Sequence, residues 1–168
     1  IVKKLAGNCK SIVGIDISDE NVLLGREYLK DSPNADMVAM DVHQLVLEEQ
    51  FDVVLCLQNG LSAMKITSPE LIEQILGRVV SGGKAYFSTY SEKFWEYRLM
   101  WFKEQADKGL LGELDMDQTK DGVIICKDGF KAITHTPEDL DRIGRLSGYA
   151  YRIHEVDESS LFLIIHKK

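Results

Sequence analysis

Short apolar runs alternate with segments of helical periodicity along most of the chain. The stretch 12–15, IVGI, is apolar at every position, which is typical of a parallel strand covered by helices on both sides. The stretch 51–57, FDVVLCL, has the same character and predicts a central strand. This alternation predicts a three-layer α/β fold with a doubly wound, mostly parallel sheet.

The remaining elements are predicted from the same patterns and from residues that typically begin or end helices and strands. Further strands are expected at 35–40, 85–89, 149–156 and 161–165, the last two as an antiparallel pair joined by DESS. Helices are expected at 1–5, 19–30, 71–79, within 92–109 and from 136 to 148. Ser68 and Pro69 are predicted to be the N-cap and a first-turn residue of the helix whose apolar positions recur over 71–79.

Residues 112–135 interrupt this alternation. The segment carries Asp-Gly twice between apolar stretches, which predicts a short antiparallel excursion laid over the main sheet. With 168 residues and no linker composition, we expect a single domain over 1–168 with a cap or excursion at about 108–135.

Composition limits the kinds of partner and the cellular location that are expected for the protein. No apolar run approaches the roughly 18 residues of a membrane span, so a cytoplasmic protein without a membrane segment is expected. Cys9, Cys56 and Cys126 are widely spaced, which indicates reduced thiols and no metal site. The net charge of −7, without a dense Lys/Arg cluster, makes a small molecule a better partner than nucleic acid. The sequence does not indicate an oligomeric state.

Asp16 stands at the predicted carboxyl end of the first strand. Ser18 is predicted to cap the helix that follows, which leaves Asp16 available for another role. Ligands of open α/β sheets bind beyond the carboxyl ends of the strands, where a carboxylate can accept hydrogen bonds from two vicinal ribose hydroxyls. The alternative is that Asp16 only caps or solvates a loop.

Five segments, in this order, resemble the class I S-adenosylmethionine-dependent methyltransferases: VGIDIS, ADMVAMD, FDVVLCLQNGLS, VVSGGKAYFSTYS and YAYRIHEVDESSLFLIIHKK. The 25-residue step from Asp16 to Asp41 adds to the resemblance. Within the class, CLQNGLS and the aromatic segment after it are most similar to small-molecule N-methyltransferases of the glycine and sarcosine type. The resemblance implies S-adenosylmethionine as cofactor and a small-molecule acceptor, with an amine as the candidate group.

The sequence departs from the family at its beginning. The family's first strand and its Gly-x-Gly-x-Gly loop precede a helix like IVKKLAGN, and here the sequence begins at Ile1. We therefore expect further residues upstream in the native protein. Without that strand, the sheet is expected to split between residues 11–16 and 51–57.

The resemblance implies a cofactor site at the strand ends. Asp16 would hold the ribose hydroxyls, and Ile17 would lie against the adenine face unless it is a core residue. Asp41 would contact the adenine amino group, with Val42 at the edge of the ring, unless Asp41 only caps the turn through HQLVLE. Leu57 ends the strand at which the methyl group would be delivered.

The acceptor residues are expected after the third and fourth strands. Asn59 suits an acceptor's amine or carboxylate, with a turn-forming Asn-Gly as the alternative. Tyr90, Trp95 and Tyr97 are candidates for a lid or for attracting a cation by their ring faces, with a role in the core as the alternative. His135 is a candidate base in the acceptor site.

Two other functions share these features. A nicotinamide-dinucleotide enzyme also places an acidic residue after its second strand. A methyltransferase-like fold can also serve as a partner subunit without catalysis.

Overall fold

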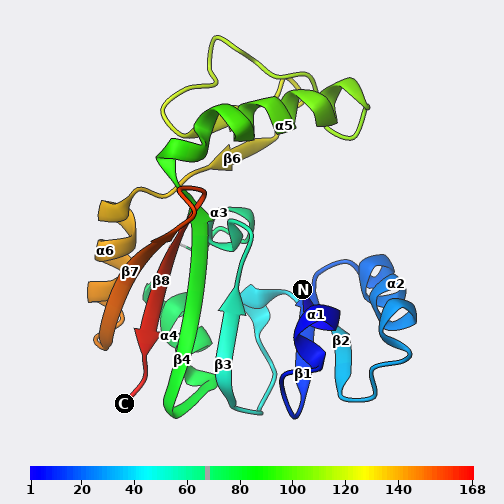
Figure 1. Cartoon of the computed structure of the whole chain (residues 1–168), viewed down its shortest axis with the longest axis vertical. Coiled ribbons are helices and arrows are strands. Elements are labelled where there is room, and N and C mark those ends of the chain that lie inside the picture. The colour runs from blue at the N-terminus through cyan, green and yellow to red at the C-terminus, as the bar shows by residue number, and fades with distance from the viewer. Residues whose placement is uncertain (67–68) are drawn as a thin grey trace. The chain divides into compact units, whose positions relative to one another are not determined.

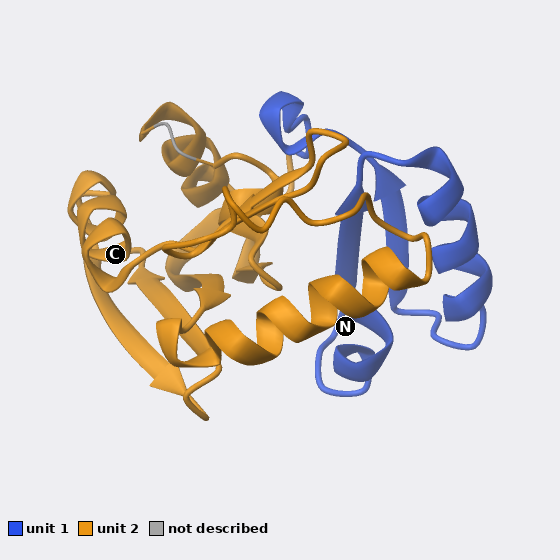
Figure 2. Ribbon diagram, turned by 90° about the horizontal axis from the view of Figure 1, so that it is seen from above, with its two compact units in different colours: residues 1–47 blue, residues 48–168 orange. Residues whose placement is uncertain are grey.

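The computed structural model describes residues 1–66 and 69–168 of the chain. These divide into two compact units, residues 1–47 and residues 48–168 (Figure 2). The single domain expected over 1–168 stays a prediction, and the expected N-cap Ser68 lies outside the described residues. Within the described part of the chain, no helix has the length and apolar character needed to cross a membrane.

Unit 1 consists of a parallel strand pair and the helices packed against it (Figure 1). Its elements are α1 (Val2–Ala6), β1 (Ile12–Asp16), α2 (Asp19–Leu29), β2 (Ala35–Ala39) and the 3₁₀ turn η1 (Val42–Gln44). The register runs from Ile12 opposite Ala35 to Asp16 opposite Ala39. Both strands therefore end at the same edge.

Close packing in unit 1 depends on two glycines. A Cβ atom on Gly14 of β1 would lie 2.5 Å from Sδ of Met37, and one on Gly25 of α2 would lie 2.9 Å from Cγ of the same residue. The absence of both Cβ atoms lets the Met37 side chain of β2 contact β1 and α2 together. The predicted cap of α2 is confirmed, since Ser18 Oγ accepts a 3.2 Å hydrogen bond from the backbone N–H of Asn21.

Unit 2 contains a four-stranded sheet and a small hairpin. Its elements are β3 (Phe51–Cys56), α3 (Gly60–Ala63), α4 (Pro69–Gly77), β4 (Val79–Tyr90), η2 (Glu92–Phe94), α5 (Trp95–Asp107), β5 (Val123–Ile125), β6 (Lys131–Ile133), α6 (Pro137–Leu146), β7 (Ala150–Val156) and β8 (Ser160–His166). The sheet order is β3-β4-β8-β7, with β3 parallel to β4 and β8 antiparallel to both of its neighbours. The expected α/β class and the antiparallel C-terminal pair are confirmed.

The predicted position of one strand in the sheet needs correction. The strand at 51–57 was expected to be central, but β3 is the outer strand of its sheet, and Val53 and Leu55 are exposed on it. An apolar run shows that a strand suits a covered position, but it does not show which neighbours pair with it. The expected split between residues 11–16 and 51–57 stays a prediction, since β1 belongs to unit 1 and β3 to unit 2.

The fourth strand begins earlier than predicted. Helix α4 ends at Gly77 and β4 already begins at Val79, whereas the apolar spacing predicted helix through residue 79. Val79 pairs with Phe51, and the next pair is Lys84 with Val53, so the strand bulges around the glycines between them. Gly82 has φ +83°, a value that favours glycine and fixes the place of this irregular turn.

The predicted antiparallel excursion forms the hairpin β5–β6, but it packs on α5 rather than across the main sheet (Figure 1). The buried residues that share this contact, here called the α5–hairpin cluster, are Phe102, Leu114, Ile124, Cys126 and Ala132. Aromatic and aliphatic side chains of α5 therefore serve a local core that is separate from the sheet.

Helix α6 is fixed at its start and along its face. Thr136 and Asp139 form a capping box, in which the Thr136 Oγ1 accepts from the Asp139 N–H at 3.2 Å and the Asp139 Oδ2 accepts from the Thr136 N–H at 3.1 Å. Gly144 faces the ring of Tyr151, whose hydroxyl donates to Asp141 Oδ1 at 2.7 Å. These contacts join α6 to β7.

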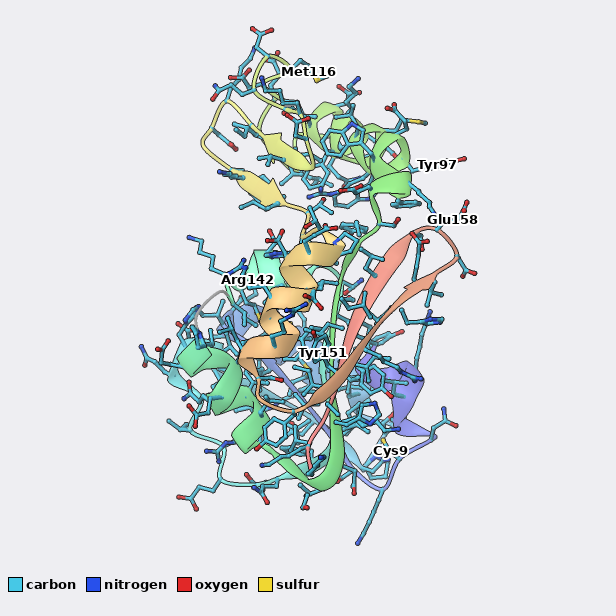
Figure 3. All side chains as sticks on the ribbon, turned by 90° about the vertical axis from the view of Figure 1, so that its left-hand side faces the viewer. Cys9, Tyr97, Met116, Arg142, Tyr151 and Glu158 are labelled. Atoms are coloured by element: carbon cyan, nitrogen blue, oxygen red, sulfur yellow. The ribbon has the colours of Figure 1, made fainter. Side chains whose placement is uncertain are left out.

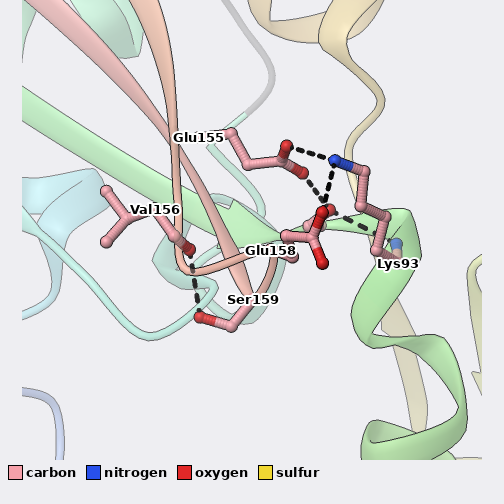
Figure 4. Close-up of polar contacts among 6 residues, drawn as sticks. Lys93, Glu155, Val156, Glu158 and Ser159 are labelled. Atoms are coloured by element: carbon pink, nitrogen blue, oxygen red, sulfur yellow. Dashed lines mark hydrogen bonds and ion pairs between the residues drawn. The ribbon is translucent and has the colours of Figure 1, made fainter.

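Polar side chains connect the segment before α5 to the β7–β8 turn (Figure 4). Lys93 Nζ lies 2.7 Å from Glu155 Oε2 and 3.3 Å from Glu158 Oε1. Ser91 Oγ donates to the other oxygen of Glu155 at 2.5 Å. The Lys93 ammonium and the Ser91 hydroxyl lower the pKa of the Glu155 carboxyl below its ordinary value.

Candidate functional site

The predicted cofactor residues of unit 1 gather at the carboxyl edge of β1 and β2. Asp16 ends β1, and Asp41 follows β2 after one intervening residue, Met40. The Met40 N–H donates to the carbonyl oxygen of Asp16 at 2.9 Å. This backbone bond extends the strand pairing to the point where both carboxylates leave the sheet.

Asp16 is engaged locally through one of its two carboxylate oxygens. Its Oδ1 accepts hydrogen bonds from the Ser18 N–H at 2.9 Å and from the Asn21 amide at 3.4 Å. Its Oδ2 has one partner among the described residues, the Asn21 amide at a long 3.5 Å. The carboxylate is therefore held in place by Oδ1, while Oδ2 keeps capacity to accept.

Asp41 has a similar division between its two oxygens. Oδ1 accepts from the His43 N–H at 2.9 Å and caps η1, which confirms the capping role considered from sequence. Oδ2 has no hydrogen-bond partner within residues 1–66 and 69–168.

Ile17 is 74% exposed and is therefore not a core residue, and Val42 is half-buried. Unit 1 thus presents two acceptor oxygens and apolar surface at one edge.

The chain after β3 adopts an unusual backbone conformation. Leu57 is half-buried, and Gln58 and Asn59 follow with φ of 57° and 60°. Two successive non-glycine residues in the left-handed region are costly, and such strain is concentrated at turns and functional sites. The turn lies at Gln58–Asn59, one residue earlier than the Asn-Gly turn considered as the alternative, because Gly60 is already the first residue of α3.

Asn59 is buried and hydrogen-bonded through both ends of its amide. Its Oδ1 accepts from Thr89 Oγ1 at 2.9 Å, and its Nδ2 donates to the carbonyl oxygen of Ile133 at 2.9 Å. The Thr89 hydroxyl also accepts from the backbone N–H of His135 at 3.1 Å. The structure therefore brings Asn59 and His135 together around Thr89, the residue before Tyr90.

The aromatic candidates form a stacked series at the start of α5. The Tyr90 ring lies 6.0 Å from that of Phe94, which in turn lies 5.4 Å from that of Tyr97. Tyr97 is 66% exposed and projects from α5 (Figure 3), whereas Trp95 packs against the α5–hairpin cluster. The Arg98 guanidinium lies 5.1 Å from the centroid of the Tyr90 ring, so a side chain of the protein already places a positive charge over this ring.

His135 is 8% exposed, and its Nε2 has no hydrogen-bond partner among the described residues. Burial lowers the pKa of His135, and Arg142 acts in the same direction, while Asp139 opposes them. The imidazole is therefore neutral near pH 7. Sequence reasoning missed Arg98, which is bonded to Thr134, the residue before His135.

Comparisons with known proteins agree with this architecture. Residues 1–83 match the family described as methyltransferase domain. A search of curated proteins finds no match. Among solved structures, an S-adenosylmethionine-dependent methyltransferase from Methanosarcina mazei is 17% identical, with 99% of this chain and 86% of that chain covered and a TM-score of 0.67.

Two further solved structures carry narrower descriptions. The N-methyltransferase NodS from Bradyrhizobium japonicum, in complex with S-adenosylhomocysteine, is 16% identical over 98% of this chain and 70% of that chain, with a TM-score of 0.56. CalS10, an amino pentose methyltransferase from Micromonospora echinaspora, is 13% identical over 98% of this chain and 78% of that chain, with a TM-score of 0.61.

The sequence match and the shared fold confirm the resemblance to class I S-adenosylmethionine-dependent methyltransferases. They also confirm the predicted enzyme class and its cofactor, S-adenosylmethionine. The match to a methyltransferase domain favours this cofactor over a nicotinamide dinucleotide.

Proposed function

We propose that the protein transfers the methyl group of S-adenosylmethionine to a small-molecule acceptor that carries an amine. The observation that carries the proposal is the pair of carboxylates, Asp16 and Asp41, at the common edge of β1 and β2. Each holds the local backbone with Oδ1 and keeps acceptor capacity on Oδ2.

These residues fit the nucleoside part of the cofactor. Asp16 Oδ2 accepts from the ribose hydroxyls, and Asp41 Oδ2 accepts from the adenine amino group. Ile17, which is exposed, and Val42 supply apolar contact for the base. Leu57 of unit 2 stays a predicted cofactor contact.

Unit 2 supplies the proposed acceptor residues, Asn59, Tyr90, Tyr97 and His135. The bound cofactor supplies an electrophilic methyl group on sulfur. An amine that arrives protonated has to lose a proton before its lone pair can attack that group. His135 is suited to accept this proton at Nε2, because burial keeps its imidazole neutral. Asn59 positions the acceptor and holds the turn after β3.

Support for an amine acceptor comes from two solved relatives, described as an N-methyltransferase and an amino pentose methyltransferase. The net charge of −7 favours a small acceptor over nucleic acid. A cytoplasmic location is proposed on the three free cysteines, Cys9, Cys56 and Cys126.

Calorimetry with S-adenosylhomocysteine and with NAD tests the cofactor. The wild type should bind S-adenosylhomocysteine and not NAD, and Asp16→Ala should weaken that binding at least about tenfold through the lost charge-assisted hydrogen bonds. Asp31→Ala, which removes an exposed carboxylate after α2, is the matched control and should bind like the wild type. Unchanged affinity in folded Asp16→Ala would disprove the ribose assignment.

Transfer of a tritiated methyl group to a panel of small amines, alcohols and carboxylic acids tests the reaction. Labelled product with amines alone is the expected result. Cofactor binding without transfer to any compound would favour the alternative of a non-catalytic binding subunit.

A further inference from the structure

Arg98 is a buried cation without a carboxylate partner among the described residues. It lies on α5 with 2% of its surface exposed. Its Nη1 donates to the carbonyl oxygen of Gly122 at 3.1 Å and to the hydroxyl of Thr134. Its Nε and Nη2 are also buried, and neither has a hydrogen-bond partner in the described part of the chain. Buried donors are normally paired, so these two require an explanation.

The two unpaired nitrogens lie on the same edge of the guanidinium plane. Nη1 is on the side of Cδ, so Nε and Nη2 together form a side-on fork of parallel N–H donors. The fork matches the spacing of the two oxygens of a carboxylate, which is the geometry of bidentate arginine–carboxylate pairs. The contacts to Gly122 and Thr134 hold the opposite edge and leave this fork unused.

The charge of Arg98 is retained at neutral pH. Burial lowers the pKa of Arg98 to about 10, a value that still leaves the guanidinium protonated near pH 7. The rings of Tyr90 and Phe102 lie 5.1 Å and 5.6 Å from its central carbon. Aromatic faces stabilise a cation from above and below its plane, but they do not accept its in-plane hydrogens. The fork therefore still lacks an acceptor.

A second unpaired group lies close by along the chain. His135 directly follows Thr134, the residue bonded to Arg98, and its buried Nε2 also lacks a partner among the described residues. The backbone N–H of His135 is bonded to Thr89, next to Tyr90. Arg98 and His135 thus both carry buried nitrogens without hydrogen-bond partners among the described residues. Both also adjoin the same two segments, around Thr134 and around Tyr90.

We propose that Arg98 binds a carboxylate of the methyl acceptor through Nε and Nη2. This inference rests on the proposed function and narrows its acceptor to an amine that also carries a carboxylate. Both nitrogens are excluded from solvent, so side chains over the fork have to move when the acceptor enters. A carboxylate then supplies both missing hydrogen bonds and the missing counter-ion.

The direct test follows the Arg98 Nε–H resonance of ¹⁵N-labelled wild-type protein, with and without S-adenosylhomocysteine. The titrants are acetate, acetamide and inorganic phosphate at equal ionic strength. Acetate should shift the resonance saturably, and acetamide, which has the same shape without the charge, should not. No shift with acetate, an equal shift with acetamide, or a stronger response to phosphate would overturn the carboxylate assignment. If acetate shifts the resonance but S-adenosylhomocysteine fails to bind, the result supports the carboxylate site and contradicts the proposed function.

Substitutions give an independent measurement of the same site. Arg98→Gln should weaken acetate binding at least about tenfold. Arg98→Lys keeps the charge but removes the fork, so its affinity for acetate should lie between those of Arg98→Gln and the wild type. Arg152→Gln makes the same change at an exposed arginine on β7 and should have no effect. Circular dichroism establishes which variants fold. Equal acetate affinity in wild type and a folded Arg98 variant would overturn the proposal, and the wild-type titration decides it if neither variant folds.

Discussion

The peptide N–H of Met40 donates a 2.9 Å hydrogen bond to the carbonyl oxygen of Asp16, one step beyond the last residue pair of the β1–β2 ladder. The bond involves backbone atoms alone, so it fixes where the Asp16 and Asp41 side chains begin whatever those side chains are. Substitutions of either carboxylate should therefore alter binding without separating the two strand ends.

Asp16→Ala should also lower the free energy of unfolding, by about 0.5–1.5 kcal/mol, because Oδ1 bonds the Ser18 N–H at the start of α2. Asp16→Asn retains a side-chain oxygen at this position and should lose less. Urea denaturation of both variants measures the difference. An equal loss in the two would show that the bond to Ser18 contributes nothing to stability.

Asn59→Ala should cost roughly 2–4 kcal/mol of stability, because it leaves the Thr89 hydroxyl and the Ile133 carbonyl without their buried partner. Gln58→Ala is the matched control, since Gln58 is exposed and has nearly the same backbone φ. Chemical denaturation compares them. Similar losses in both variants would assign the effect to backbone strain rather than to the hydrogen bonds.

Gly144→Ala should destabilise the protein by about 1–3 kcal/mol, because the new Cβ would lie 2.4 Å from the Tyr151 ring. Moving the ring would also disturb the hydrogen bond from its hydroxyl to Asp141. Gly77→Ala adds a methyl group where no atom lies within 4 Å, at the last residue of α4, and should be neutral or slightly stabilising. Thermal melts of the two variants should therefore shift in opposite directions or differ clearly in size.

Stability should fall as the pH drops below 6.5, the ordinary pKa of histidine, because of His135. Its folded-state pKa lies lower, so the unfolded chain binds the proton first and gains stability relative to the fold. The contribution is complete above pH 6.5 and is lost as the pH falls toward the folded-state pKa. His135→Gln should show a flatter dependence over this window in urea titrations. An unchanged slope would mean that His135 is protonated equally in both states.

Much of the fold follows from local sequence signals. Ser18 caps α2 as predicted, and the helix expected from residue 136 begins directly after Thr136, which caps it. These features depend on neighbouring residues, which a sequence shows directly. The order of the strands in a sheet does not depend on neighbouring residues alone. β3 is an outer strand, although its composition indicated a central one.

The candidate site was predicted in part for the same reason. The positions of Asp16 and Asp41 at the ends of two strands were predicted because strand ends are visible in the apolar pattern. Arg98 was missed because its burial depends on the hairpin residues Gly122 and Thr134, which lie 24 and 36 residues away along the chain. Local periodicity marked α5 as an aromatic helix, but it did not reveal which segment would cover it.

The left-handed pair Gln58–Asn59 has a consequence for the order of folding. The conformation is unfavourable in an isolated segment, and its side-chain partners, Thr89 and Ile133, lie 30 and 74 residues further along the chain. Bonds between such distant residues form late, after loop closure has brought β4 and β6 to the end of β3. The turn at Gln58–Asn59 is therefore completed near the end of folding, and the loss of Asn59 should accelerate unfolding far more than it slows folding.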